Sequence, residues 1–163
     1  MVMNNSRNLA SASGQPEETE PQQLNSVTTP SVPARVLVVE DEPEILEPLA
    51  HSLHKAGYVV LRAEDGLSAC RSIGNDNPDL VLLDIMLPDL DGWEVCKLLR
   101  QHPDPSIAGI PVIMLTALNS PHDKYRGLEL GADAFLPKPD ALREVLLQAG
   151  NLIRRRRQTV DLD

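Results

Sequence analysis

The chain reads Leu80-Val81-Leu82-Leu83-Asp84 near its middle, a run of four apolar residues that ends in a carboxylate. Two further runs have the same design: residues 36–39 precede Glu40, and residues 112–115 precede Thr116. Short apolar runs of this kind are typical of strands that are buried on both faces, as in a parallel sheet covered by helices. The sequence therefore predicts three central strands, each followed by a polar side chain.

Weaker strand patterns and amphipathic segments fill the intervals between these runs. Residues 58–61 and 134–136 complete a set of five strands. Ile45, Leu49 and Leu53 recur at the spacing of a helix, and Gly57 is a suitable stop for it. Four further helices are expected at residues 67–73, 92–102, 120–130 and 142–153. Strands that alternate with helices over about 120 residues predict a doubly wound α/β sandwich.

The helix expected over residues 92–102 carries the only tryptophan of the chain. Val95, Leu98 and Leu99 are expected to form its buried face. Trp93 is expected to lie partly on the surface of this helix rather than in a ligand pocket.

The composition favours a folded domain with polar extensions. Against 24 acidic residues stand 15 lysines and arginines, and the formal net charge of −9 argues against a general binder of nucleic acids or membrane surfaces. No apolar run approaches the roughly 20 residues that cross a bilayer, and the two cysteines lack metal-ligand spacing. We therefore expect a cytoplasmic protein with a disordered N-terminal tail (1–34), one folded domain (35–155) and a C-terminal tail or truncated linker (156–163).

Polar side chains at the ends of the predicted strands should meet at one edge of the sheet. Glu40 and Asp41 follow the first strand, Asp84 ends the third, Thr116 ends the fourth and Lys138 follows the fifth. Ligands of open parallel sheets bind outside the carboxyl ends of the strands. Clustered carboxylates suit a hard cation such as Mg²⁺, and a carboxylate beside that ion can form an aspartyl phosphate. The competing interpretation is that each acidic residue only caps or solvates a loop.

Four motifs together resemble the receiver domain of two-component response regulators. They read VLVVEDEP at residues 36–43, LLDIMLPDLDG at 82–92, TA at 116–117 and GADAFLPKP at 131–139. The resemblance covers about residues 35–153. It implies a flavodoxin-like (βα)5 fold, in which a doubly wound parallel sheet of five strands has the order 2-1-3-4-5.

The resemblance also implies a chemical role for each residue at the strand ends. Asp84 would accept a phosphoryl group from a histidine kinase or a histidine phosphotransfer protein. Lys138 would pair with Asp84 and later with a phosphoryl oxygen. Glu40, Asp41, Asp84 and the backbone carbonyl of Met86 would hold Mg²⁺, for which Mn²⁺ can substitute.

The function implied by the resemblance is a phosphorylation-dependent signalling switch rather than an enzyme. Thr116 would hydrogen-bond the phosphoryl group, and Phe135 would turn inward to fill the vacated space. These movements would change the face made by the fourth helix, fifth strand and fifth helix, which also offers a surface for a homodimer. The output would pass to a downstream protein or to a separate output domain. The plainer alternatives are that Phe135 is only a core residue and that Thr116 only ends its strand.

Two other functions remain open at this stage. A receiver-like binding module that works without phosphorylation would usually have lost Asp84, Asp41 or Lys138, and all three are present. An aspartate-nucleophile phosphatase of the haloacid-dehalogenase type would carry a second aspartate where this chain has Met86. Direct nucleic-acid binding is not favoured either, since the arginines at 154–157 suit the C-terminal end of a helix dipole.

Overall fold

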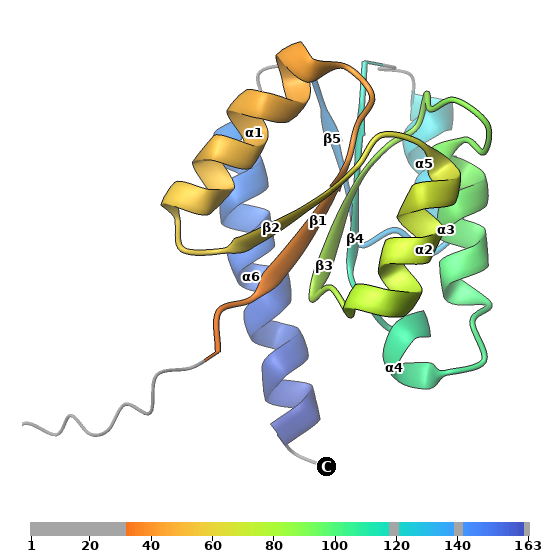
Figure 1. The fold of residues 1–163 in the computed structure, drawn as a ribbon. Coiled ribbons are helices and arrows are strands. Elements are labelled where there is room, and N and C mark those ends of the chain that lie inside the picture. The colour runs from red at the N-terminus through yellow and green to blue at the C-terminus, as the bar shows by residue number, and fades with distance from the viewer. Residues whose placement is uncertain (1–31, 118–120, 139–141, 162–163) are drawn as a thin grey trace, which may run out of the picture. The chain divides into compact units, whose positions relative to one another are not determined.

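The protein is described by a computed structural model over residues 32–117, 121–138 and 142–161. Its centre is a parallel sheet of five strands in the order β2-β1-β3-β4-β5, as the resemblance implied (Figure 1). The elements in chain order are β1 (Arg35–Val39), α1 (Pro43–Lys55), β2 (Val59–Ala63), α2 (Gly66–Asp76), β3 (Leu80–Asp84), α3 (Gly92–Arg100), α4 (Pro105–Ala108), β4 (Val112–Thr116), α5 (Pro121–Glu129), β5 (Ala134–Pro137) and α6 (Leu142–Asp161).

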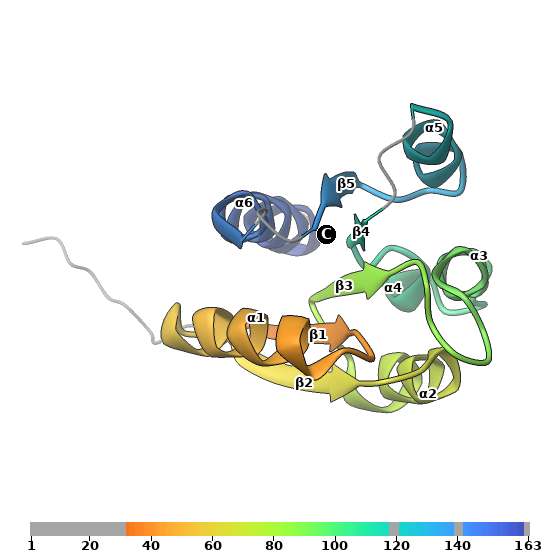
Figure 2. The same cartoon turned by 90° about the horizontal axis from the view of Figure 1, so that it is seen from above.

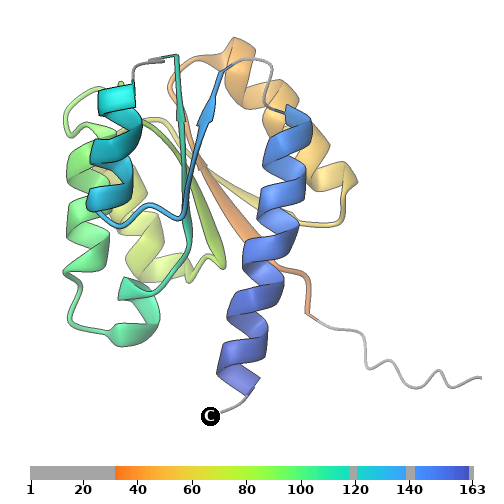
Figure 3. The same cartoon turned by 180° about the vertical axis from the view of Figure 1, so that it is seen from behind.

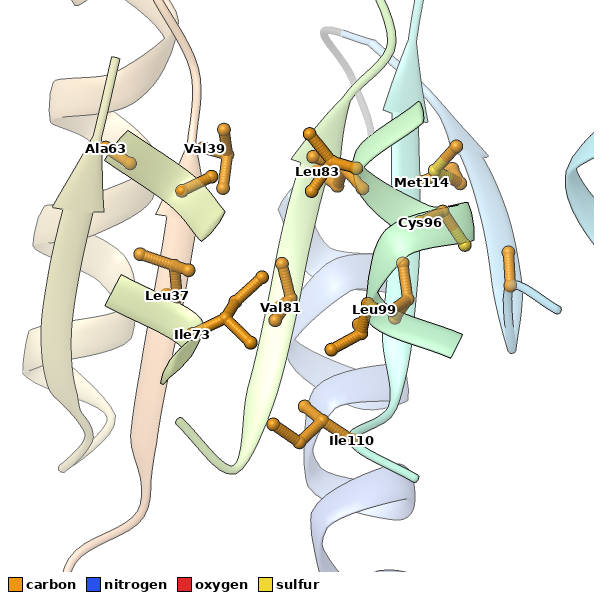
Figure 4. Packing of buried hydrophobic residues seen from close by; sticks show 14 of the residues in the cluster. Leu37, Val39, Ala63, Ile73, Val81, Leu83, Cys96, Leu99, Ile110 and Met114 are labelled. Atoms are coloured by element: carbon orange, nitrogen blue, oxygen red, sulfur yellow. The ribbon is translucent and has the colours of Figure 1, made fainter. Parts of the chain in front are cut away.

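Helices cover both faces of the sheet and leave no apolar face of the central strands in water. Helices α1 and α6 lie on one side, and α2, α3, α4 and α5 lie on the other (Figures 2 and 3). Successive side chains of a strand point to opposite faces. In β1, Val36 and Val38 therefore pack with α1 and α6, whereas Leu37 and Val39 pack with α2 and α3 (Figure 4). This double burial explains why the central strands are uninterrupted apolar runs.

The structure differs from the sequence-based expectations in three respects, which concern helices α4 and α3. Helix α4 was not predicted; Asp104 caps it by accepting a hydrogen bond from the backbone N–H of Ser106 at 2.9 Å. The expected buried face of α3 was partly wrong, because Leu98 is 47% exposed. The expected surface position of Trp93 was also wrong, since this residue is only 7% exposed and belongs to the core.

The predicted domain limits can be compared with the structure at the C-terminal end but not at the N-terminal end. Residues 1–31 of the expected tail lie outside the described residues. At the other end, α6 continues to Asp161, through most of the segment that the sequence assigned to a C-terminal tail. None of the helices in the described part of the chain has the length and apolar character that a membrane span requires.

Candidate functional site

Three carboxylates gather at the carboxyl edge of the sheet, which is its upper edge in Figure 1. Strands β1 and β3 are neighbours with Val39 opposite Leu83, so the next residues, Glu40 and Asp84, lie side by side. Asp41 follows directly, and one oxygen from each of the three carboxylates lies within 4.8 Å of the others. The predicted convergence of these three residues is therefore present in the structure.

The cluster is buried at its base and open at its rim. Glu40 is 1% exposed and Asp84 is 2% exposed, whereas Asp41 is exposed to solvent. Charged groups are rarely fully buried unless a counter-charge or an ion accompanies them. The site therefore needs positive charge close to its two inner carboxylates.

Lys138 supplies one such charge. Its Nζ lies 2.6 Å from Oε2 of Glu40 and 3.2 Å from Oδ2 of Asp84, and its side chain is 8% exposed. The backbone N–H of Lys138 donates to the carbonyl oxygen of Thr116 at 2.8 Å, which fixes the start of the loop after β5. The sequence predicted the pairing with Asp84 but missed the shorter contact with Glu40.

Burial and neighbouring charge shift the pKa values of this pair. Burial raises the pKa of Glu40 to about 7; the hydrogen bond from Lys138 opposes this shift, and the charge of Asp84 adds to it. Burial alone would lower the pKa of Lys138, but its hydrogen bond with Glu40 and the charge of Asp84 hold that pKa above its ordinary value. Lys138 therefore stays cationic beside the two buried carboxyl groups, and Glu40 keeps its proton more readily than an ordinary carboxyl group does.

The second oxygen of Asp84 faces the loop between β3 and α3. The backbone N–H of Met86 donates to Oδ1 of Asp84 at 3.3 Å, so the main chain of Met86 lies beside this carboxylate. The side chain of Met86 is exposed. Gly92, the first residue of α3, allows this loop to fold tightly: a Cβ there would overlap the carbonyl oxygen of Asp84 and lie 2.8 Å from Cα of Ile85.

Thr116 and Phe135 lie on one face of the sheet, next to the site. Phe135 is opposite Met114 on the neighbouring strand, and Thr116 follows Met114 by two residues on the same face. Thr116 is fully buried, whereas Phe135 is half-buried and packs against the core on the α2–α3 side. Thr116 and Phe135 therefore lie on the same face of two neighbouring strands.

The residues present fit a hard divalent cation. Among the described residues, the site gathers three carboxylates, and the ammonium group of Lys138 contacts two of them. Two negative charges are therefore left uncompensated when all four groups are ionised. Carboxylate and carbonyl oxygens are the ligands that Mg²⁺ prefers, and such sites usually keep several waters. The exposed carboxylate of Asp41 gives an ion and its waters access from solvent.

The sequence did not predict a groove that adjoins Lys138. It has a volume of about 230 Å³ and lies between α1 and α6, with walls that include Ile45, Pro48, Leu142 and Val145. Pro48 is an exposed residue inside α1. The groove becomes visible only when the two helices are packed side by side.

The doubly wound sheet, with three carboxylates and a lysine at its carboxyl edge, places the chain among the flavodoxin-like proteins that have an acidic site at this edge. Within that class, the chain belongs to the response regulator receiver domain family, whose model matches residues 36–149. Members of this family act in phosphorylation-dependent signalling by two-component systems, and they are signalling switches rather than classical enzymes. The predicted family and fold are thereby confirmed.

Individual relatives agree with this assignment. The chain is 45% identical over 124 residues to response regulator MprA of Mycobacterium sp. strain KMS, an alignment that covers 76% of this chain and 52% of that protein. It is 45% identical over 121 residues to the alkaline phosphatase synthesis transcriptional regulatory protein PhoP of Bacillus subtilis, covering 74% of this chain and 49% of that protein. The chain thus spans about half the length of these curated relatives.

The fold is similar to that of solved receiver structures. A putative response regulator from Chloroflexus aurantiacus superimposes with a TM-score of 0.71 at 36% identity, covering 76% of this chain and 99% of that one. The chemotaxis response regulator CheY4 of Vibrio cholerae gives a TM-score of 0.68 at 30% identity, covering 74% of this chain and 99% of that one.

Proposed function

We propose that the domain accepts a phosphoryl group on Asp84 from a phosphohistidine of a histidine kinase or a histidine phosphotransfer protein. The observation that carries this proposal is the position of Asp84. It is buried at the sheet edge, one of its oxygens lies 3.2 Å from the ammonium group of Lys138, and the other accepts from the backbone of Met86. The oxygens of Glu40 and Asp41 lie beside it.

The chemistry is a single phosphoryl transfer. An oxygen of Asp84 would form a bond to phosphorus while the bond between phosphorus and the donor imidazole nitrogen breaks, and that nitrogen would regain a proton from water. Lys138 would stabilise the negative charge that develops on the phosphoryl oxygens. Glu40, Asp41, Asp84 and the Met86 carbonyl would hold Mg²⁺, which supplies a further counter-charge when bound.

The phosphorylated state would be read through a protein surface. Thr116 would hydrogen-bond the phosphoryl group and Phe135 would move inward, which would change the face formed by α5, β5 and α6. That face already carries exposed apolar side chains: Tyr125, Leu128 and Leu147. The exposed apolar surface supports an output through a homodimer or through a downstream protein or output domain.

A donor with a bond between phosphorus and nitrogen tests this proposal. Incubation with phosphoramidate and Mg²⁺ should add one phosphoryl group to the intact protein by mass spectrometry, and Asp84→Asn should remain unlabelled. If the wild-type protein is folded but stays unlabelled, this result contradicts the proposal and favours a binding module that works without phosphorylation. Continuous turnover of p-nitrophenyl phosphate would instead indicate a phosphatase.

A further inference from the structure

The indole of Trp93 lies between α3 and α5. Although it belongs to the first turn of α3, it is largely buried, and the guanidinium carbon of Arg126 on α5 lies 4.7 Å from the centre of its ring. This distance is within the range of an attractive cation–π interaction. Helices α3 and α5 lie on the same side of the sheet (Figure 3). The contact therefore joins α5 to the layer beneath it.

The residue after Arg126 brings the same part of α5 onto Phe135. A Cβ at Gly127 would lie 3.0 Å from Cδ2 of Phe135 and 3.4 Å from Cζ3 of Trp93. Both aromatic rings therefore touch the α5 backbone at one glycine, where a larger side chain would have to displace one of them. Trp93 from α3 and Phe135 from β5 therefore both pack against α5 at Gly127.

We propose that Arg126 and Trp93 are positioning residues that hold α5 over Phe135 in the conformation of this structure. The inference rests on the proposed function, because it concerns how phosphorylation of Asp84 reaches α5. Inward movement of Phe135 would remove its ring from beneath Gly127, and α5 would then settle in a new position relative to Trp93. The cation–π contact would have to loosen in that step, so its strength would bias the equilibrium between the two arrangements.

Removal of the Arg126 guanidinium should shift that equilibrium toward the rearranged state. A cation–π contact at a partly exposed site corresponds to a population change of about two- to fivefold. Since the rearranged state is the one that phosphorylation favours, Arg126→Ala should be phosphorylated about two- to fivefold faster by phosphoramidate. Arg126→Lys keeps the cation and should lie between Arg126→Ala and the wild type.

The single tryptophan of the chain reports on the contact directly. Wild-type fluorescence should change on phosphorylation, and the unphosphorylated Arg126→Ala protein should already show part of that change. Lys97→Ala is the matched control, because it removes an exposed cation from α3 itself. It should behave as the wild type does in both measurements.

The two possible failures can be told apart. If Arg126→Ala folds, becomes labelled at the wild-type rate and shows the wild-type fluorescence change, the positioning role is contradicted and the phosphoryl-accepting function stands. If mass spectrometry finds no label on either protein, the proposed function fails and the inference fails with it. Circular dichroism on all variants separates these results from simple unfolding.

Discussion

Lys138 is the residue whose neighbours most constrain the proposed chemistry, because its ammonium group contacts both buried carboxylates. Its place near Asp84 could be predicted from the sequence, since both residues follow strands whose carboxyl ends meet at one edge. Its shorter contact with Glu40 could not, because that contact depends on side-chain conformations at the ends of β1 and β5, which are separated by two other strands. The buried position of Trp93 was also unpredictable, since it depends on how α5 packs over α3.

Replacement of Lys138 by methionine should make the fold depend on a divalent cation. Two buried carboxylates would lose their counter-charge, and breaking a buried ion pair typically costs about 3 to 5 kcal/mol. Urea denaturation in EDTA should show a loss of this order, and added Mg²⁺ should restore part of it. The control Lys97→Met changes an exposed lysine and should have little effect. Equal stability of Lys138→Met and wild type in EDTA would show that Lys138 does not neutralise the site.

Gly92→Ala should damage both stability and phosphorylation. The new Cβ would overlap the carbonyl oxygen of Asp84, so the main chain that carries the phosphoacceptor would have to shift. We expect a loss of about 2 kcal/mol or more in urea denaturation and slower labelling by phosphoramidate. In Gly74→Ala, by contrast, the Cβ meets nothing within 4 Å, and this helical substitution should stabilise the protein by roughly 0.5 to 1 kcal/mol. If Gly92→Ala were labelled at the wild-type rate, this would contradict the close approach of Gly92 to the carbonyl oxygen of Asp84.

The secondary-structure elements follow their sequence patterns most closely where burial is complete. The three central strands have no solvent-facing side, so they could be predicted from their uninterrupted apolar runs. Helix α4 could not, because its four residues are too few to show a helical period. Leu98 has the spacing of a core residue yet lies half-exposed, because α3 also turns Trp93 and Cys96 inward.

The N-terminal end of α2 should respond to pH. The carboxylate of Asp65 accepts a hydrogen bond from the backbone N–H of Ser68 at 2.7 Å, and this bond lowers the pKa of Asp65 below its ordinary value of 3.8. Because folding lowers this pKa, the ionised cap stabilises the fold above pH 3.8, and this contribution disappears as the pH falls through the folded-state pKa. Asp65→Asn keeps an acceptor that does not titrate.

Urea midpoints of both proteins at about pH 6 and about pH 3 check this expectation. The wild type should be more stable than Asp65→Asn at the higher pH, and the difference should shrink at the lower one. A difference that stays constant over this range would mean that the cap charge does not stabilise α2.

The fold is stabilised by two apolar layers, one on each face of the sheet. Leu37 faces the α2–α3 layer and Leu82 faces the α1–α6 layer, and both are completely buried. Each replacement by alanine should lower the free energy of unfolding by about 2 to 5 kcal/mol. Leu147→Ala, at a position that is 59% exposed, should cost far less. A small loss at Leu37 or Leu82 in urea denaturation would show that the corresponding layer is loosely packed.

The carboxyl edge of the sheet, between the two layers, carries Asp84. We propose above that Asp84 receives a phosphoryl group with the help of Mg²⁺. Peptide mass spectrometry after labelling with phosphoramidate, followed by peptic digestion at low pH, tests this claim most directly. With Mg²⁺ the phosphoryl group should be found on the peptide that contains Asp84, and with EDTA that peptide should be unmodified. A phosphoryl group on another residue, or equal labelling of Asp84 in EDTA, would contradict it.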